Sequence, residues 1–208
     1  PTLALLLGGR RQPEGWAGSR DAADFYDLKG DLESLFALTG CEGAFSFAAA
    51  ERAGLHPGQT AAVHRGDAVV GYLGALHPET LATLDLDRPL YVAEIDLAAL
   101  LEARLPAFAP VSRFPEIRRD LAIIDREVPA AAIVADVRAM AGPYFKELTL
   151  FDVYAGKGID PKRKSLAIGL TFRDQSRTLD DEEVTQAVEQ VAQQRRGGGQ
   201  DPRGGGAG

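Results

Sequence analysis

The sequence predicts two domains in series, an α/β domain built on an antiparallel sheet with helices, followed by an α+β domain. Its 208 residues suffice for two domains of about 100 residues each. Pro106, Pro110 and Pro115 bracket a stretch without helical periodicity, which indicates a linker between about Pro106 and Pro110. After this linker, segments of period two alternate with segments whose apolar residues recur every three or four positions, the pattern of mixed strands and helices.

The first predicted domain covers residues 1–108 and opens on TLALLLGG, an apolar run that is typical of a strand. Because the chain begins there without a methionine, we interpret it as a fragment of a longer protein. A helix is expected from about Asp27, since acidic residues near a helix start are favoured by the helix dipole. Its apolar positions are expected to face a core: Leu32, Leu35, Phe36 and Leu38.

The second predicted domain covers residues 109–194 and starts with a strand over Arg118–Ile124, between Pro115 and a polar run. Pro129 suits the first turn of a helix, and Gly142-Pro143 ends it. The helix is predicted from apolar residues at three- and four-residue spacing: Ile133, Val134, Val137 and Met140.

Two strands, 148–154 and 166–173, are predicted to form the next pair, joined by a loop rich in glycine and lysine. In the second strand Leu166, Ile168, Leu170 and Phe172 alternate with small or polar residues, so one face of the sheet is expected to be covered. A last helix is predicted from a capping box of Thr178 and Asp181, with a core stripe of Val184, Val188 and Val191.

The resulting order βαββα lacks only the final strand of a ferredoxin-like βαββαβ sandwich. Without that strand, residues 118–124 are expected to form an unpaired edge of the sheet. Residues 195–208 read RRGGGQDPRGGGAG, which has no apolar periodicity. We therefore expect a disordered tail of glycine and arginine there, in place of the last strand.

Charge is distributed unevenly between the two predicted domains. Residues 1–108 contain 8 Lys and Arg against 15 Asp and Glu, whereas residues 109–208 contain 15 of each. Binding to nucleic acid depends on local positive charge, so the first domain is a poor candidate and any RNA should bind the second. The single cysteine and the absence of a long apolar run favour a cytoplasmic protein with no membrane partner.

No pattern in the sequence predicts a catalytic residue or a metal ligand. Asp24, Asp27 and Asp31 resemble a metal cluster only superficially, because they surround a predicted helix start. His56, His64 and His77 lack metal-ligand spacing, and Cys41 lies in a glycine turn with no evident base. The loop Gly156-Lys157-Gly158 leads into a strand, not a helix, and so does not have the form of a phosphate-binding loop.

Long segments of the chain resemble the beta subunit of the bacterial phenylalanyl-tRNA synthetase family. RFPEIRRDLAIID (113–125) and KELTLFDVYAGKGIDPKRKSLAIGLTFRDQSRTLDDEEV (146–184) are similar to its ferredoxin-fold anticodon-binding domain. DFYDLKGDLESLF (24–36), GYLGALHPE (71–79) and YVAEIDLAAL (91–100) are similar to the catalytic-like domain that precedes it, a degenerate class II synthetase fold. The resemblance extends over residues 1 to about 194.

This resemblance implies a region that takes no part in the chemistry of aminoacylation. In the family, the alpha subunit holds phenylalanine, ATP and magnesium, and the enzyme is a cytoplasmic heterotetramer of two alpha and two beta subunits. We therefore expect this fragment to bind no cofactor, to pack against the alpha subunit and to bind the anticodon of the tRNA for phenylalanine. Two alternatives stay open on fold alone, an amino-acid-sensing regulatory module and a pure subunit-interface domain.

Cations at the strand ends of the second domain are the predicted RNA contacts, because the strand 166–172 offers no aromatic platform for stacking bases. The alternative for Arg118, Arg119 and Arg173 is simple surface pairing with Asp120, Asp152 or Asp174. The predicted RNA-binding residues are Arg113, Arg118, Arg119, Lys157, Lys164, Arg173 and Arg177.

Overall fold

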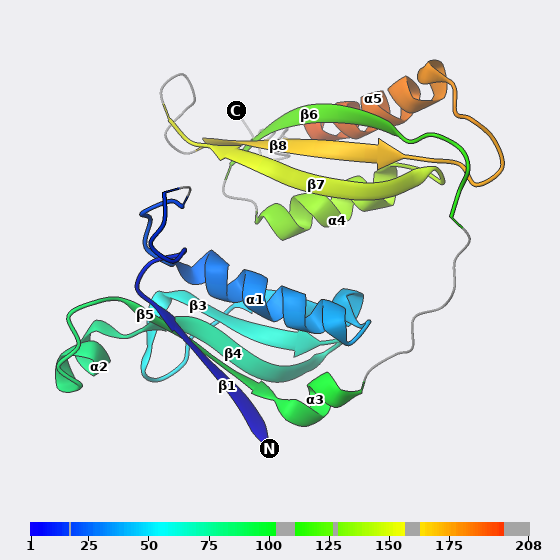
Figure 1. Ribbon diagram of the computed structural model, residues 1–208. Helices are drawn as coiled ribbons and strands as arrows, with labels where there is room; N and C mark the ends of the chain where they lie inside the picture. Colours follow the sequence, from blue (N-terminus) through cyan, green and yellow to red (C-terminus); the bar gives the residue numbers. More distant parts are fainter. Residues whose placement is uncertain (17, 103–110, 127–128, 157–162, 198–208) are drawn as a thin grey trace, which may run out of the picture. The chain divides into compact units, whose positions relative to one another are not determined.

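The computed structural model describes residues 1–16, 18–102, 111–126, 129–156 and 163–197. The chain divides into two compact units, Pro1–Phe108 and Ala109–Gly208 (Figure 1). The predicted linker and the part of the predicted tail after Gly197 lie outside the described residues.

Unit 1 is built on a five-stranded sheet in the order β1-β5-β4-β3-β2, in which every neighbouring pair is antiparallel (Figure 1). This confirms the predicted antiparallel sheet with helices. Its strands are β1 (Thr2–Gly8), β2 (Phe45–Ala49), β3 (Leu55–Arg65), β4 (Ala68–Leu76) and β5 (Leu90–Asp96). Its helices are α1 (Phe25–Leu38), α2 (Pro78–Thr83) and α3 (Leu97–Leu101), with a 3₁₀ turn at Glu42–Ala44.

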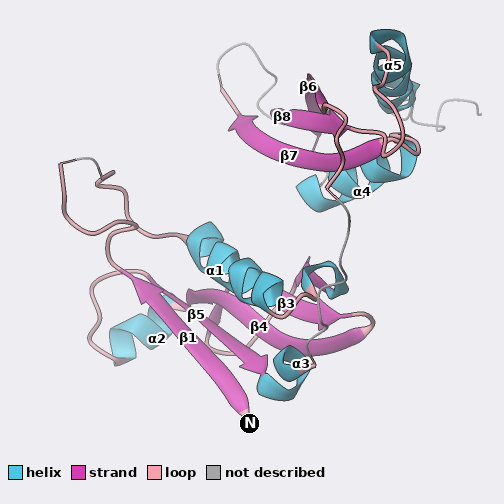
Figure 2. Ribbon diagram, turned by 45° about the vertical axis from the view of Figure 1, so that its right-hand side comes forward, coloured by secondary structure: helices cyan, strands magenta, loops and turns pink. Residues whose placement is uncertain are grey.

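Helix α1 lies across one face of this sheet (Figure 2). Its buried residues Leu28, Leu32 and Phe36 form one core with residues of β3, β4 and β5. The sequence also placed Leu38 in this core, and that prediction was wrong, because Leu38 is 85% exposed. Two residues beyond Phe36, its side chain is rotated by about 200° around the helix and leaves the buried stripe.

Unit 2 has the predicted order βαββα, with a three-stranded antiparallel sheet in the order β6-β8-β7. Its elements are β6 (Ile117–Arg126), α4 (Ala130–Met140), β7 (Phe145–Tyr154), β8 (Arg163–Phe172) and α5 (Asp181–Gly197). In the described part of the chain, β6 pairs with β8 alone and forms one edge of the sheet. This is the order of a ferredoxin-like sheet without its fourth strand.

Both helices of unit 2 pack on the same face of the sheet. Leu166, Ile168, Leu170 and Phe172 of β8 are all at most 1% exposed and share one core with α4 and α5. The helices contribute Ile133 and Val137 from α4, and Val184 and Val191 from α5. The predicted alternation in β8 is confirmed, and the opposite face of the sheet has no described helix against it.

Helix α5 begins later than the sequence predicted. The Asp180 carbonyl accepts a hydrogen bond from the Val184 N–H (3.4 Å), and the Glu183 carboxylate accepts one from the Asp180 N–H (3.1 Å). Asp180 therefore caps the helix, and the predicted capping box of Thr178 and Asp181 was wrong by two residues. The helix also extends to Gly197, three residues past the predicted end of the domain.

Candidate nucleic-acid interface

The helix-free face of the unit 2 sheet is lined by small residues at its centre. The register places Arg118 opposite Thr171, Asp120 opposite Gly169, and Ala122 opposite Ala167. On the other side of β8, Thr149 lies opposite Gly169. Because side chains alternate between the two faces of a strand, these residues belong to the face opposite Leu166 and Leu170. We call this surface the open face.

Arg118 extends across the open face from β6. Its Nε donates a hydrogen bond to Asp120 (2.9 Å), and its guanidinium lies 5.4 Å from the centre of the Phe151 ring of β7. Between the two outer strands it passes over Gly169, whose Cα has no side chain to obstruct it. The side chain is still 54% exposed, so Arg118 is accessible to a ligand.

Aromatic side chains reach this surface from β7, which the sequence analysis did not consider. Phe151 is 50% exposed and Tyr154 is 47% exposed. A register shift between Leu150 and Asp152 interrupts the regular alternation of β7 at Phe151. The expectation concerned the strand 166–172, whose open face carries no aromatic residue, and the exposed aromatic residues come from the neighbouring β7. The sequence carries no signal for this position, because the bulge arises only from the pairing of β7 with β8.

The other predicted cations that the structure describes are distributed over several surfaces and do not form one patch. Arg119 is opposite the buried Leu170, on the helix side, and pairs with Asp181 of α5 (2.8 Å). Arg173 follows β8 and pairs with Glu116 (2.7 Å), which also binds Lys146. The hydrogen bond from Lys146 lowers the pKa of Glu116.

Of the remaining predicted contacts, Arg113 is exposed and Lys164 is partly buried at the start of β8. Lys157 lies outside the described residues. Surface pairing of Arg118 with Asp120 was one of the two interpretations of the sequence, and it occurs. For Arg119 and Arg173 pairing also occurs, but with partners that the sequence analysis did not name.

Arg177 is held at the start of α5 by several groups at once. It donates two hydrogen bonds to Glu183 (2.7 and 2.6 Å) and one to the Tyr144 hydroxyl (3.2 Å), and its Cζ lies 5.5 Å from the centre of the Tyr144 ring. The hydrogen bond from Arg177 and that from the Asp180 N–H lower the pKa of Glu183 to about 2. This arrangement ties the loop before α5 to the turn between α4 and β7, so the geometry gives Arg177 a structural role.

Comparison with known proteins identifies both units. Residues 1–97 match the phenylalanyl-tRNA synthetase beta chain CLM domain, and residues 112–197 match the ferredoxin-fold anticodon-binding domain. The chain belongs to the phenylalanyl-tRNA synthetase beta-chain family. Its membership agrees with the resemblance that the sequence motifs suggested.

Similar proteins carry the name phenylalanine–tRNA ligase beta subunit. That of Pseudomonas savastanoi pv. phaseolicola is 53% identical over 185 residues, which cover 88% of this chain and 23% of the relative. That of Pseudomonas fluorescens is 50% identical over 192 residues, 92% of this chain and 24% of the relative. That of Coxiella burnetii is 45% identical over 191 residues, with 91% and 24% covered. The chain thus spans about a quarter of the length of these relatives.

In the CLM unit of this beta-chain region, the acidic residues before α1 serve the helix. Asp24 accepts hydrogen bonds from the N–H groups of Tyr26 and Asp27, and the Asp27 carboxylate accepts one from the Asp24 N–H. Arg11 binds both carboxylates at 2.9 to 3.0 Å. Burial opposes the ionisation of Asp27, but the bonds from Asp24 and Arg11 outweigh it and lower its pKa. Asp24 and Asp27 thus form a helix cap with an arginine counterion.

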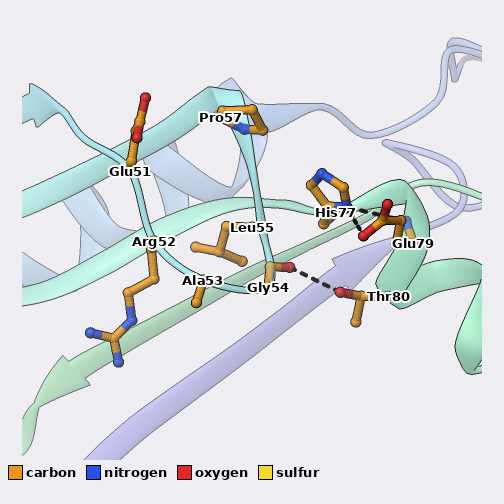
Figure 3. A pocket seen from close by; sticks show the side chains of 9 residues that line it. All are labelled: Glu51, Arg52, Ala53, Gly54, Leu55, Pro57, His77, Glu79 and Thr80. Atoms are coloured by element: carbon orange, nitrogen blue, oxygen red, sulfur yellow. Dashed lines mark hydrogen bonds and ion pairs between the residues drawn. The ribbon is translucent and has the colours of Figure 1, made fainter.

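The CLM unit also has an open, polar pocket of about 480 Å³ (Figure 3). One wall is the loop 51–54, in which Glu51 and Arg52 point in opposite directions, and the other is the start of α2 (Figure 3). His77 uses its Nδ1 to accept the Glu79 N–H (3.2 Å), and its backbone N–H binds the Gly54 carbonyl (2.9 Å). His77 therefore caps α2, an arrangement that leaves the pocket without a paired nucleophile and base.

Within the described ranges, no group of three or more His, Cys, Asp or Glu side chains is placed to hold a metal ion. Cys41 is buried, and its thiol lies 3.4 Å from the Glu102 carbonyl. None of the described helices is long and apolar enough to cross a membrane.

Proposed function

We propose that this chain is a tRNA-binding, non-catalytic region of an enzyme that attaches phenylalanine to its tRNA at the expense of ATP. The observation that carries this proposal is the open face of a domain that matches anticodon-binding domains, with Arg118 and Phe151 both exposed on it. Single-stranded RNA is bound in general by cations that contact its backbone together with planar groups that stack on its bases. The open face offers both kinds of group.

We infer that the RNA contacts come from the predicted cations, with Arg118 at the centre of the open face. Arg113 before β6 and Lys164 near the start of β8 add positive charge, and the third proposed cation, Lys157, lies outside the described residues. Like Arg118, three further arginines already have carboxylate partners, so each of the four contributes less net charge to a phosphate: Arg119, Arg173 and Arg177.

The proposal assigns the chemistry to other parts of the enzyme. We expect ATP and magnesium to bind to the alpha subunit, with which the degenerate class II-like sheet of unit 1 would pack. A heterotetramer of two alpha and two beta subunits in the cytoplasm is the assembly we propose. The relatives' names support an additional subunit, since they are called beta subunits.

Salt-dependent binding tests this proposal. The full 208-residue chain should bind the tRNA for phenylalanine more tightly than a non-cognate tRNA, with an affinity that falls as salt rises. Replacing Arg118 or Arg173 by alanine should reduce the slope of log affinity against log salt by roughly one unit for each phosphate that the variant no longer binds. Unchanged affinity and slope in both folded variants would refute these assignments.

The two alternatives predict different results in the same assay. A regulatory module would show a higher melting temperature with free amino acid and no affinity for tRNA. A pure interface domain would bind a partner chain and no tRNA. Binding to tRNA by the wild-type chain therefore separates the proposed function from both.

A further inference from the structure

Gly169 occupies a position where the backbone conformation does not require glycine. Its φ is not among the positive values found for other glycines of the chain, such as Gly142. A Cβ built on Gly169 would nevertheless lie only 2.6 to 2.8 Å from three atoms of the Arg118 guanidinium group. The missing side chain therefore makes room for Arg118 to lie directly on the backbone of β8. This contact also explains why Gly169 is buried although it belongs to the open face.

Asp120 fixes the other end of this arrangement. It is opposite Gly169 in the register and accepts the hydrogen bond from Arg118 Nε. Both side chains are more than half exposed, at 54% and 57%, and an exposed ion pair contributes little to stability. Its effect is orientation, since it holds the guanidinium over the sheet. The pair is also neutral overall, which weakens its attraction for phosphate and leaves the planar surface of Arg118 as its distinctive property.

Phe151 continues that surface on β7. Its ring centre lies 5.4 Å from Arg118 Cζ, within the range of a cation–π contact, and half of its side chain is exposed. The neighbouring positions across the strands are small, as at Ala122 and Ala167. A planar cation and an aromatic ring thus stand together above a shallow surface. Such groups are the ones on which unpaired bases stack.

We propose that Arg118 and Phe151 form one platform for stacking an unpaired base of RNA, and that Asp120 and Gly169 are positioning residues that hold Arg118 over the sheet and near Phe151. This inference rests on the proposed function and deepens it, because it assigns Arg118 to base stacking. A phosphate contact would need only its charge. The platform needs its planar shape as well.

Variants that keep the charge and remove the shape test the platform. Arg118→Lys retains the cation without the planar guanidinium, Phe151→Leu retains an apolar side chain without the ring, and Gly169→Ala displaces Arg118. Each should bind the tRNA for phenylalanine about tenfold more weakly, the loss expected for one base stack. The salt slope should stay unchanged, because no charge is removed.

An RNA hairpin with the same number of phosphates and a minimal loop provides the matched probe, because it presents almost no unpaired base. The three variants should bind this hairpin as the wild type does. Lys164→Ala is the contrasting variant, since removing a cation that binds the RNA backbone should weaken binding to both RNAs and lower both salt slopes. If the extra methyl group of Gly169→Ala prevents folding, Phe151→Leu still tests the platform. Phe151 is half exposed, so its replacement should leave the fold intact.

The outcomes separate this inference from the proposed function. Failure of the wild-type chain to bind either RNA would refute the proposed function, and the platform with it. Normal binding of tRNA by the wild type, with the same affinity in Arg118→Lys and Phe151→Leu, would overturn the platform alone. An equal loss for tRNA and hairpin would also overturn it, because the effect would not depend on unpaired bases.

Discussion

Glu183 joins two parts of unit 2 through its carboxylate. It accepts hydrogen bonds from Arg177 in the loop before α5 and from the backbone N–H of Asp180 at the start of that helix. These bonds lower its pKa from 4.5 to about 2. A carboxyl group whose pKa is lower in the folded chain than in the unfolded chain stabilises the fold fully at pH values above its pKa in the unfolded chain. That stabilisation is lost as the pH falls through the folded value.

The stability that Glu183 contributes is therefore lost between about pH 4.5 and about pH 2. We expect Glu183→Gln to lower the free energy of unfolding of unit 2 at pH 7, and this difference from the wild type to shrink towards zero near pH 2. Urea unfolding at a series of pH values measures it. Glu182→Gln removes an equal charge from the first turn of α5 and serves as the control. A difference that does not change with pH would contradict the role assigned to the carboxylate.

The ion pairs of the arginines show why residue partners escape sequence reasoning. Arg119 pairs with Asp181, and Arg173 pairs with Glu116 on a segment 57 residues earlier in the chain. These partners come together only because β6, β8 and α5 pack as they do. Local sequence named Asp120 correctly for Arg118, because that pair is two residues apart on one strand.

At the scale of elements, the strands and helices of unit 2 follow directly from sequence periodicity. The predicted strand 118–124 is part of β6, and the predicted helix that starts near Pro129 is α4. Both have strong apolar repeats and clear end signals. The start of α5 was less accessible, because Thr178 and Asp180 are both good caps and the choice depends on where Glu183 can reach. The bulge at Phe151 likewise depends on pairing with β8.

Helix α1 allows a direct comparison of two leucines with different environments. Leu32 is completely buried, whereas Leu38 is 85% exposed. Leu32→Ala should destabilise unit 1 by about 2–5 kcal/mol, because it removes buried methyl groups and leaves a cavity. Leu38→Ala should change stability by no more than about 0.5 kcal/mol, as is usual at the surface. Urea unfolding monitored by circular dichroism measures both, and equal losses would show that the α1 core is misassigned.

For the molecule as a whole, our proposal places the ATP-dependent reaction outside this chain and the binding of tRNA on unit 2. The CLM unit has carboxylates and histidines, but those before α1 and at the start of α2 are engaged in capping helices. Its residues 1–108 are acidic, with 15 Asp and Glu against 8 Lys and Arg. The anticodon-binding unit carries the more balanced charge and the open face. This distribution of charge supports the proposal that tRNA binds through unit 2.

This division predicts that the chain alone cannot activate phenylalanine. Formation of an aminoacyl-adenylate requires groups that hold ATP and its magnesium ion, usually carboxylates and cations that converge on the phosphates. In the CLM unit, Asp24 and Asp27 are bound to Arg11, and His77 caps α2. We therefore expect the purified chain to show no phenylalanine-dependent exchange of pyrophosphate into ATP. Exchange above the level of a denatured control would contradict the assignment. In a preparation that binds tRNA, absence of exchange would separate recognition from catalysis.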